Sequence, residues 1–143
     1  MKKLLIAFGL LFLAADSPQA IVKYRQTSMK AMGAHMSAIS LVVKHQIASR
    51  ADLAVHAEAI AGLSRSVGEW FPAGTGPDKV KSGAKAEIWR QMPELKRDAA
   101  RLERESAKLV ELAKKKDTKA FDAQYIVVAN TCDDCHDVFR VRD

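Results

Sequence analysis

The sequence predicts an all-α fold, an antiparallel up-down four-helix bundle formed by residues 16–143. Two observations lead to this prediction. Apolar residues recur at alternating gaps of three and four along this part of the chain, which is the period of a helix and not of a strand. Glycine and proline gather between the periodic segments, most densely in residues 71–87. Four narrow apolar seams in one domain are typical of helices that pack nearly parallel around a single core.

The first fifteen residues have the pattern of a secretory signal peptide. Lys2 and Lys3 precede an uncharged, mostly apolar run from Leu4 to Ala15. The run is too short for a membrane span, which needs roughly 20 apolar residues, so no stable membrane insertion is expected. We expect cleavage after Ala15, with Ala20 as the alternative, and export to the periplasm. Cysteines in that oxidising compartment need not stay reduced.

The first helix is expected to begin at Pro18, because Ser17 can cap it and proline is favoured in its first turn. Its core-facing residues are Val22, Arg25, Met29, Met32, Met36, Ile39 and Val43. The core-facing residues of the second helix are Leu53, His56, Ile60, Leu63, Val67 and Trp70. A short link around Ala48 joins these two helices and makes them antiparallel neighbours.

The start of the third helix is ambiguous. Its core-facing residues are Ile88, Met92, Leu95, Ala99, Leu102, Ser106, Leu109 and Ala113. Pro93 disfavours a continuous helix from Ile88, because proline lacks an N–H and clashes inside a helix. Either residues 86–92 form a separate turn or the helix begins at Pro93. Three lysines, at positions 114–116, close it where the helix dipole favours cations.

The fourth helix follows after a short join and is expected to be capped by Asp117. Its core-facing residues are Phe121, Tyr125, Val128, Cys132, Cys135 and Phe139. The connection between the second and third helices, residues 71–87, is by contrast long. Connections of this length are uncommon in compact domains and are often functional or mobile.

Composition argues against several classes of function. The formal net charge of +6 falls to +4 when Lys2 and Lys3 leave with the signal peptide, since 6 minus 2 is 4. This mild basicity indicates solubility or an acidic protein partner, and we expect no nucleic-acid binding. No carboxylate pair and no nucleophile–base pair stands out, so the protein is not expected to be an enzyme.

Both cysteines lie in one motif, Cys132-Asp-Asp-Cys135-His136, on the core-facing stripe of the fourth helix. A disulfide, a zinc site, a redox dithiol and a covalent haem all use this cysteine spacing. Zinc needs about four ligands, and the other three histidines are far away in sequence. A thioredoxin-like dithiol belongs at a strand-to-helix turn, and no strand is predicted. A plain disulfide explains the cysteines but leaves His136 without a role.

Covalent haem explains the whole motif. Two thiols three residues apart can each bond one vinyl group along the same haem edge, and the next residue then points its imidazole at the iron. This spacing is the c-type haem attachment pattern. We therefore expect one covalently attached haem c per chain, bound through Cys132 and Cys135 near the C-terminal end of the fourth helix, with His136 as an axial ligand of the iron.

Similarity to a known family is concentrated in three segments, Val22–Met29, Glu87–Trp89 and Cys132–Arg140. They resemble class II c-type cytochromes, the family of cytochrome c′ and cytochrome c-556, and the resemblance covers essentially the chain after residue 15. It implies thioether bonds at both cysteines of the motif and a proximal ligand at His136. Phe139 departs from the family pattern, in which many members have tyrosine, and we expect little effect.

The same resemblance addresses the distal side of the iron. Low-spin members of the cytochrome c-556 type have a methionine there, whereas high-spin cytochromes c′ have a non-ligating apolar residue. The matching position is Met29, so the resemblance implies Met29 as the distal axial ligand. Met32 and Met36 follow on the same stripe, methionine is a common core residue, and at most one of the three binds iron. His35 is a distant rival that we expect at the surface.

Arg25 occupies a core-facing position one turn before Met29, where an unpaired charge is costly. A haem propionate would supply a carboxylate for its guanidinium, with Gln26 assisting. The alternative is that the long side chain carries its charge out to solvent. Three aromatic residues are expected either to wall the haem pocket or to belong to the ordinary core, and they are Trp70, Trp89 and Phe139. His45 and His56 are interpreted as structural or solvated.

The expected function is that of a periplasmic monohaem c-type cytochrome, a one-electron carrier between soluble or membrane-bound redox proteins. Histidine and methionine as the two axial ligands favour electron transfer and a raised potential. The alternative is a cytochrome c′-type protein that binds nitric oxide or carbon monoxide at an open or displaceable sixth position. A third hypothesis is an exported bundle with a simple disulfide. The resemblance also allows a homodimer formed through the first two helices.

Overall fold

The computed structural model describes residues 16–141, and within them the chain is all-helical, which confirms the predicted fold class. The expected signal peptide, residues 1–15, lies outside the described residues, so the boundary after Ala15 stays a prediction. The elements are α1 (Pro18–Val43), α2 (Leu53–Ser64), the 3₁₀ turn η1 (Val67–Glu69), α3 (Glu87–Arg90), α4 (Met92–Lys115) and α5 (Thr118–Phe139).

Both predicted helix caps are confirmed. The Ser17 hydroxyl accepts a hydrogen bond from the Ala20 N–H at 3.2 Å, and proline opens α1. The Asp117 carboxylate accepts one from the Ala120 N–H at 3.1 Å and caps α5. Each side chain satisfies a backbone donor that the first helical turn leaves without a partner. These local signals fix where the helices begin.

The second helix ends earlier than predicted. The expected core stripe ran on to Trp70, but α2 stops at Ser64 and the chain continues through η1. The Ser64 hydroxyl donates to the Ala61 carbonyl at 2.9 Å and contacts the buried hydroxyl of Ser106 at 3.1 Å. Serine and glycine in the following residues are weak helix formers, so the helix gives way to a tighter turn. Trp70 is nevertheless buried.

The helix is interrupted just before Pro93, at Gln91, which resolves the ambiguity about its start. Residues Glu87–Arg90 form the separate turn α3, and α4 begins at Met92 with Pro93 in its first turn. A missing N–H costs little there, because first-turn N–H groups have no partner inside the helix. Two lysines occupy the last turn of α4, and Lys116 closes it in a left-handed conformation with φ 56°.

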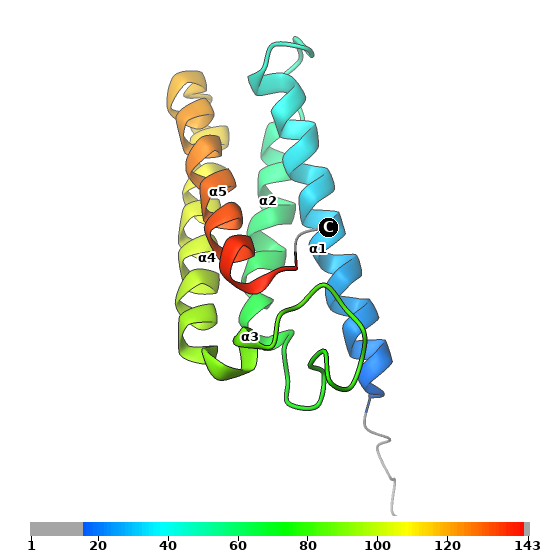
Figure 1. The fold of residues 1–143 in the computed structure, drawn as a ribbon. Coiled ribbons are helices and arrows are strands. Elements are labelled where there is room, and N and C mark those ends of the chain that lie inside the picture. The colour runs from blue at the N-terminus through cyan, green and yellow to red at the C-terminus, as the bar shows by residue number, and fades with distance from the viewer. Residues whose placement is uncertain (1–15, 142–143) are drawn as a thin grey trace, which may run out of the picture.

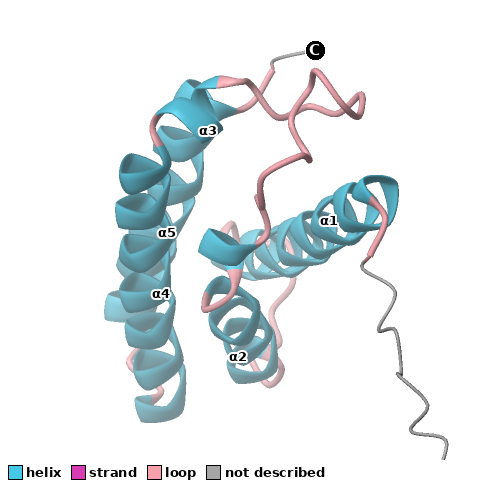
Figure 2. Cartoon of the chain, turned by 90° about the horizontal axis from the view of Figure 1, so that it is seen from below, coloured by secondary structure: helices cyan, strands magenta, loops and turns pink. Residues whose placement is uncertain are grey.

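The four long helices run up, down, up and down (Figure 1). Helix α4 packs closely along both α2 and α5, and α1 packs along α2, whereas α1 and α5 touch only sparsely. Figure 2 shows the result from below as two helix pairs, α1 with α2 and α4 with α5, with loop residues 71–86 passing between them. No helix within the described residues is long and apolar enough to cross a membrane.

The core is filled mainly by side chains from the four long helices, with additions from η1, the loop and α3. Its fully buried large members are Ile39, Ile60, Ile88, Leu95, Leu109, Phe121 and Val128. Met29, Met36, Tyr125, Cys132 and Cys135 are partly buried and pack against this cluster. These five side chains come from α1 and α5, the two helices with little mutual contact, while other partly buried side chains come from the remaining helices. Along the seam between α1 and α5 the core is therefore only partly covered.

Candidate haem site at the loop end of the bundle

The C-terminal end of α5 is fixed by loop residues 71–86. The Lys85 N–H donates to the Phe139 carbonyl at 2.9 Å, and the Val141 N–H donates to the Gly83 carbonyl at 2.8 Å. Ala84 and Arg140 form an isolated antiparallel bridge between these two bonds. The loop and the end of α5 lie together at the end of the bundle where α1 begins (Figure 1). This pairing holds the Cys-x-x-Cys-His segment in place.

The same loop holds the early part of α1 through Arg25. One terminal nitrogen of its guanidinium donates to the Thr75 hydroxyl at 2.9 Å, and the other donates to the Thr75 carbonyl at 3.0 Å and the Ser82 hydroxyl at 3.1 Å. Thr75 is 1% exposed, and its hydroxyl donates a hydrogen bond to the Pro72 carbonyl at 2.8 Å. One loop therefore positions both the first turns of α1 and the last turns of α5.

Arg25 carries a buried charge among neutral partners. The side chain is 3% exposed, so it does not carry its charge out to solvent. The guanidinium carbon lies 4.9 Å from the Phe71 ring centroid and 5.5 Å from that of Trp89, and burial lowers the pKa of the group. A buried cation without an opposite charge is costly. The surroundings therefore fit an added carboxylate, such as a haem propionate.

The two cysteines have the properties of thiols that stay protonated. Both are free and partly buried. Burial, with a smaller effect of Asp133, raises the pKa of Cys132 to about 11. Burial, followed by Asp98 and Cys132, raises the pKa of Cys135 to about 12. Zinc ligands and redox dithiols react as thiolates, which this environment disfavours, whereas an uncharged thioether suits it.

A zinc site finds no further support. Within residues 16–141 no three side chains of histidine, cysteine, aspartate or glutamate converge to hold a metal ion. Cys132, Cys135 and His136 thus lie on one helix without additional ligands from elsewhere in the described chain. This arrangement fits two thioether bonds and one axial ligand, the set that a c-type haem requires.

His136 is half-buried on the last turn of α5, one turn after Cys132. Burial and then the charge of Arg140 lower the pKa of His136, while Asp133 and Asp137 act in the opposite direction. A metal binds the neutral imidazole, so a lowered pKa keeps the side chain in its ligating form. The residue fits the axial role predicted for it.

The remaining predicted residues are placed as follows. Met29 is partly buried against the core and lies one turn after Arg25, while Met32 is more deeply buried. The side chain of Gln26 is exposed, and it is not among the partners of the Arg25 guanidinium in the described structure.

Trp89 lies at the site beside Arg25, whereas Trp70 packs edge-on against Tyr24 with ring centroids 6.2 Å apart. Phe139 is buried.

Three residues of the site could not be named from the sequence. Phe71, Thr75 and Ser82 belong to the loop and surround Arg25. The length of the loop predicted a functional segment, but no periodicity marks which of its residues turn inward. The prediction for His35 was wrong, because this residue is half-buried and its ring lies against His56 rather than at the free surface.

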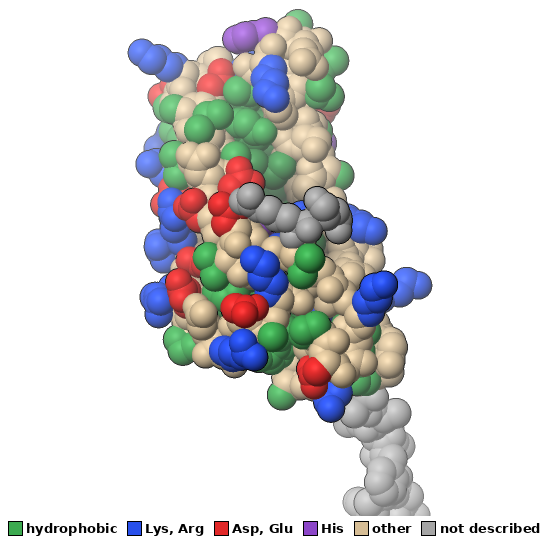
Figure 3. Space-filling view, viewed as in Figure 1, with side chains coloured by type: hydrophobic (Ala, Val, Ile, Leu, Met, Phe, Trp, Pro, Cys, Tyr) green, Lys and Arg blue, Asp and Glu red, His purple; other side chains and the backbone are tan. Residues whose placement is uncertain are grey.

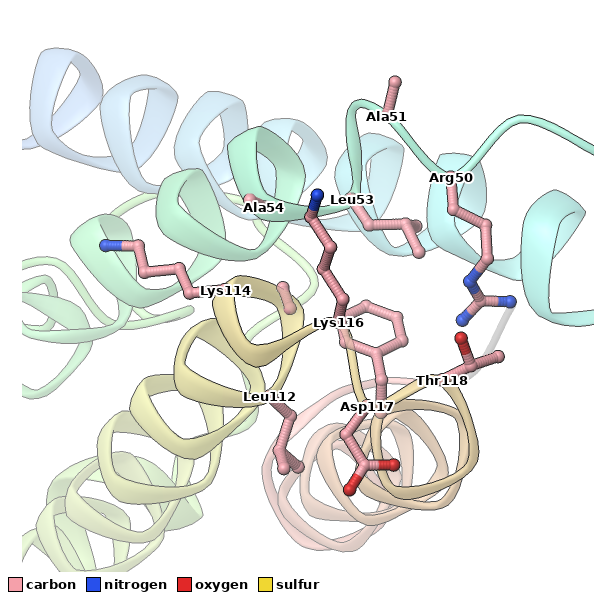
Figure 4. A pocket seen from close by; sticks show the side chains of 11 residues that line it. Arg50, Ala51, Leu53, Ala54, Leu112, Lys114, Lys116, Asp117 and Thr118 are labelled. Atoms are coloured by element: carbon pink, nitrogen blue, oxygen red, sulfur yellow. The ribbon is translucent and has the colours of Figure 1, made fainter.

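Hollows elsewhere on the surface do not coincide with this site. One of about 490 Å³ lies at the opposite end of the bundle, where Arg50, Lys114 and Lys116 stand around an apolar floor (Figure 4). Another of about 480 Å³ lies between the start of α1 and Trp70. Neither lining includes the haem-attachment motif. On the face that α5 and α1 share, hydrophobic side chains gather along the seam between them (Figure 3).

Comparisons with known proteins agree with this geometry. The family model described as Cytochrome C′ matches residues 20–140. The cytochrome c′ of Pararhodospirillum photometricum is 39% identical over 124 residues, which are 87% of this chain and 98% of that protein.

Two solved structures of cytochromes c′ add detail. The first is a nitric oxide complex of a variant from Alcaligenes xylosoxidans, which has a TM-score of 0.80 and 27% identity. The second is described as having an unusual ligand-controlled dimer dissociation, with a TM-score of 0.82 and 24% identity. In each case the match covers 90% of this chain and 100% of the solved one.

Proposed function

The chain belongs to the cytochrome c′ family and is a monohaem class II c-type cytochrome with covalently bound haem c, and on that premise we propose that it binds nitric oxide or carbon monoxide at the haem iron. This was the alternative function in the sequence analysis. The comparisons support it better than they support a one-electron carrier, because variants of the cytochrome c′ from Alcaligenes xylosoxidans have been solved with nitric oxide bound. The cytochrome c-556 subtype finds no such support.

The roles of the residues follow from the site. Cys132 and Cys135 hold the haem through thioethers, and His136 binds the iron on the proximal side. Bound haem supplies an iron that can take up a diatomic ligand or an electron. Arg25, fixed by Thr75 and Ser82, neutralises a propionate and sets the orientation of the haem in the bundle.

The observation that carries this function is that apolar side chains of α1 pack against the same core cluster as Cys132 and Cys135, where the distal side of the iron would lie. On α1 the side chains available there, Met29 and Met32, are thioethers that pack against the core. An uncharged diatomic gas needs little more than an apolar space beside the iron. In this proposal Met29 would lie over the iron and would give way to the gas.

The second candidate function is the electron carrier, and Met29 is the observation that favours it. A thioether bound firmly opposite His136 would keep the iron six-coordinate in both oxidation states, so little would reorganise during electron transfer. The two functions therefore differ in one property, the strength of the bond between Met29 and the iron.

Optical spectra of the purified protein with and without carbon monoxide test the proposal. We expect the ferrous protein to be high-spin, or to lose its low-spin bands readily when the gas is added. Met29→Leu should bind the gas at least as fast as the wild type. Met32→Leu is the matched control, because it keeps the apolar volume on the next turn and should change nothing. A ferrous protein that stays low-spin and resists carbon monoxide until Met29 is replaced would favour the electron carrier.

The proposed location is the periplasm, and the proposed role is binding rather than catalysis. A secretory signal peptide is the sequence feature that supports export. N-terminal sequencing of the haem-loaded protein should give Asp16 as the first residue.

We further propose that the protein is able to form a homodimer, since a cytochrome c′ of similar structure forms dimers that a ligand dissociates. Redox partner proteins belong to the electron-carrier alternative.

A further inference from the structure

A pair of histidines lies outside the haem site. His35 on α1 and His56 on α2 place their Nδ1 atoms 2.9 Å apart, with ring centroids separated by 5.2 Å and planes tilted by 54°. Both side chains are partly buried, so each keeps one side toward water. The residues come from two different helices and from distant positions in the sequence. Neither has a part in holding the haem.

The short contact constrains the protons of the pair. At this distance one Nδ1 donates its hydrogen and the other accepts with its lone pair. Two neutral imidazoles held by packed helices are also the ligands that divalent transition metals prefer. A metal ion can replace the shared hydrogen if the donor ring carries its proton on Nε2 instead, and this exchange leaves the charge of the two rings unchanged.

The separation of the two nitrogens selects among metals. Nitrogens about 2.0–2.1 Å from a metal ion lie roughly 2.9 Å apart when the angle at the metal is about 90°, and roughly 3.3 Å apart in a tetrahedron. The observed 2.9 Å fits the right angle. Square-planar and tetragonal geometries are those of copper(II) and nickel(II), and copper(II) also binds nitrogen ligands most strongly in the general order of affinities. The two nitrogens already face each other, so a small turn of each ring about χ2, a broad torsion for histidine, is enough to direct both lone pairs at one ion.

We propose that His35 and His56 form a two-ligand binding site for a divalent transition-metal ion, with copper(II) bound more tightly than nickel(II) and nickel(II) more tightly than zinc(II). Within the described chain no third histidine, cysteine or carboxylate converges on the pair, so water fills the other positions. An ion bound there bridges α1 and α2.

The site is separate from the haem. His35 follows Met29 by six residues, which is about 9 Å along the helix and roughly 240° around its axis. Metal bound at the pair therefore stands on another side of α1 than the side that faces the iron. The haem spectrum serves as an internal control, because it should not change when the pair is filled.

Copper(II) titration of the ferric, haem-loaded protein without an affinity tag tests the proposal. We expect one ion per chain, nitrogen hyperfine lines from two imidazoles in the copper resonance spectrum, and a rise in the unfolding temperature from the bridge between the helices. His35→Gln and His56→Gln should each weaken binding by more than tenfold, roughly the least that loss of a supporting group near a metal costs. The double variant should bind copper(II) more weakly than either single variant, because it has lost both imidazole ligands.

His45→Asn is the matched control. This histidine is exposed and has φ 57°, a conformation that asparagine tolerates, so the variant removes an imidazole without disturbing the pair. It should keep full copper binding. The proposal is wrong if His35→Gln and His56→Gln, with unchanged haem spectra, still bind one copper(II) as tightly as the wild type, or if His45→Asn is the variant that loses it.

Discussion

The two ends of the bundle differ in how they balance an arginine that lies against an aromatic ring, buried in the case of Arg25 and half-buried in the case of Arg50. At the end away from the haem site, Arg50 forms an ion pair with Asp122, and its guanidinium carbon lies 5.6 Å from the Phe121 ring centroid. At the haem end, Arg25 stacks near Phe71 in a similar manner, yet its hydrogen-bond partners are hydroxyls and a carbonyl. The first arginine has its counter-charge within the chain and the second does not.

The difference shows which end is complete by itself. A cation at the far end is balanced by a neighbouring carboxylate, so the polypeptide alone satisfies it. The haem end instead combines an unbalanced cation, which is unfavourable without a further group, with two partly buried thiols that burial keeps protonated. Covalent haem supplies both a carboxylate and the carbons to which the sulfurs bond. The haem end is therefore built around a group that the chain does not contain.

The largest test of this contrast uses two equivalent leucines of α4. Leu109 is 0% exposed and Leu95 is 1% exposed, but Leu95 lies in the first turns of the helix, at the haem end. Replacement of either by alanine should lower the free energy of unfolding by about 2–5 kcal/mol, because each leaves a cavity in the core. Denaturant unfolding measures the loss.

The optical spectrum separates the two leucine variants. We expect Leu95→Ala to alter the haem bands and Leu109→Ala to leave them as in the wild type. Equal spectra in both variants, or a change confined to Leu109→Ala, would mean that the two ends do not differ in the way described.

Much of the fold could be predicted because its causes are local. The alternation of three and four residues, the capping side chains Ser17 and Asp117, and Pro93 each act within a turn or two of their own position. The attachment motif is local as well, since the spacing of Cys132, Cys135 and His136 within one helix carries the chemistry. These features needed no knowledge of how the chain folds back on itself.

The missed features depend on contacts between distant segments. Thr75 and Ser82 hold Arg25 across about fifty residues of sequence, and nothing near them indicates that they face inward. His35 was expected at the surface, and its contact with His56 on a different helix has no signal in the local sequence. Tertiary contacts decided each of these cases.

A smaller effect is expected when the two arginines are compared directly. Arg25→Leu should lower the reduction potential by roughly 60 mV or less, up to a tenfold change in a one-electron equilibrium, because a propionate loses its cation and the ferric state gains. Arg50→Leu should leave the potential unchanged and reduce stability instead, since it leaves Asp122 without its partner. Potentiometric titration of both variants measures this, and a similar potential in both would remove the distinction between the ends.

The smallest effect concerns Asp98, an acidic group close enough to the haem end to raise the pKa of Cys135. Burial, and then the charge of Glu94, raise the pKa of Asp98 above the ordinary value of 3.8. The folded state therefore holds this proton more tightly than the unfolded state, so the charged carboxylate costs stability at neutral pH. That cost fades as the pH falls through the raised pKa and is absent below 3.8. Asp98→Asn removes the charge and should stabilise the protein at pH 7 by about 0.5 kcal/mol or less, because much of the carboxyl still contacts water.

The pH dependence distinguishes this cause from a change in packing. Thermal unfolding of the wild type and Asp98→Asn at a series of pH values should give a difference that is largest near neutrality and vanishes as the pH approaches 3.8. A gain that stays constant down to acid would come from packing. A loss of stability at pH 7 would show that the carboxylate is favoured in the fold, through Arg97 and Arg101, whose charges act against burial. Arg97 and Arg101 would then balance the charge of Asp98 at the haem end, as Asp122 balances Arg50 at the far end. Arg25 would be the charge at the haem end that lacks such a partner.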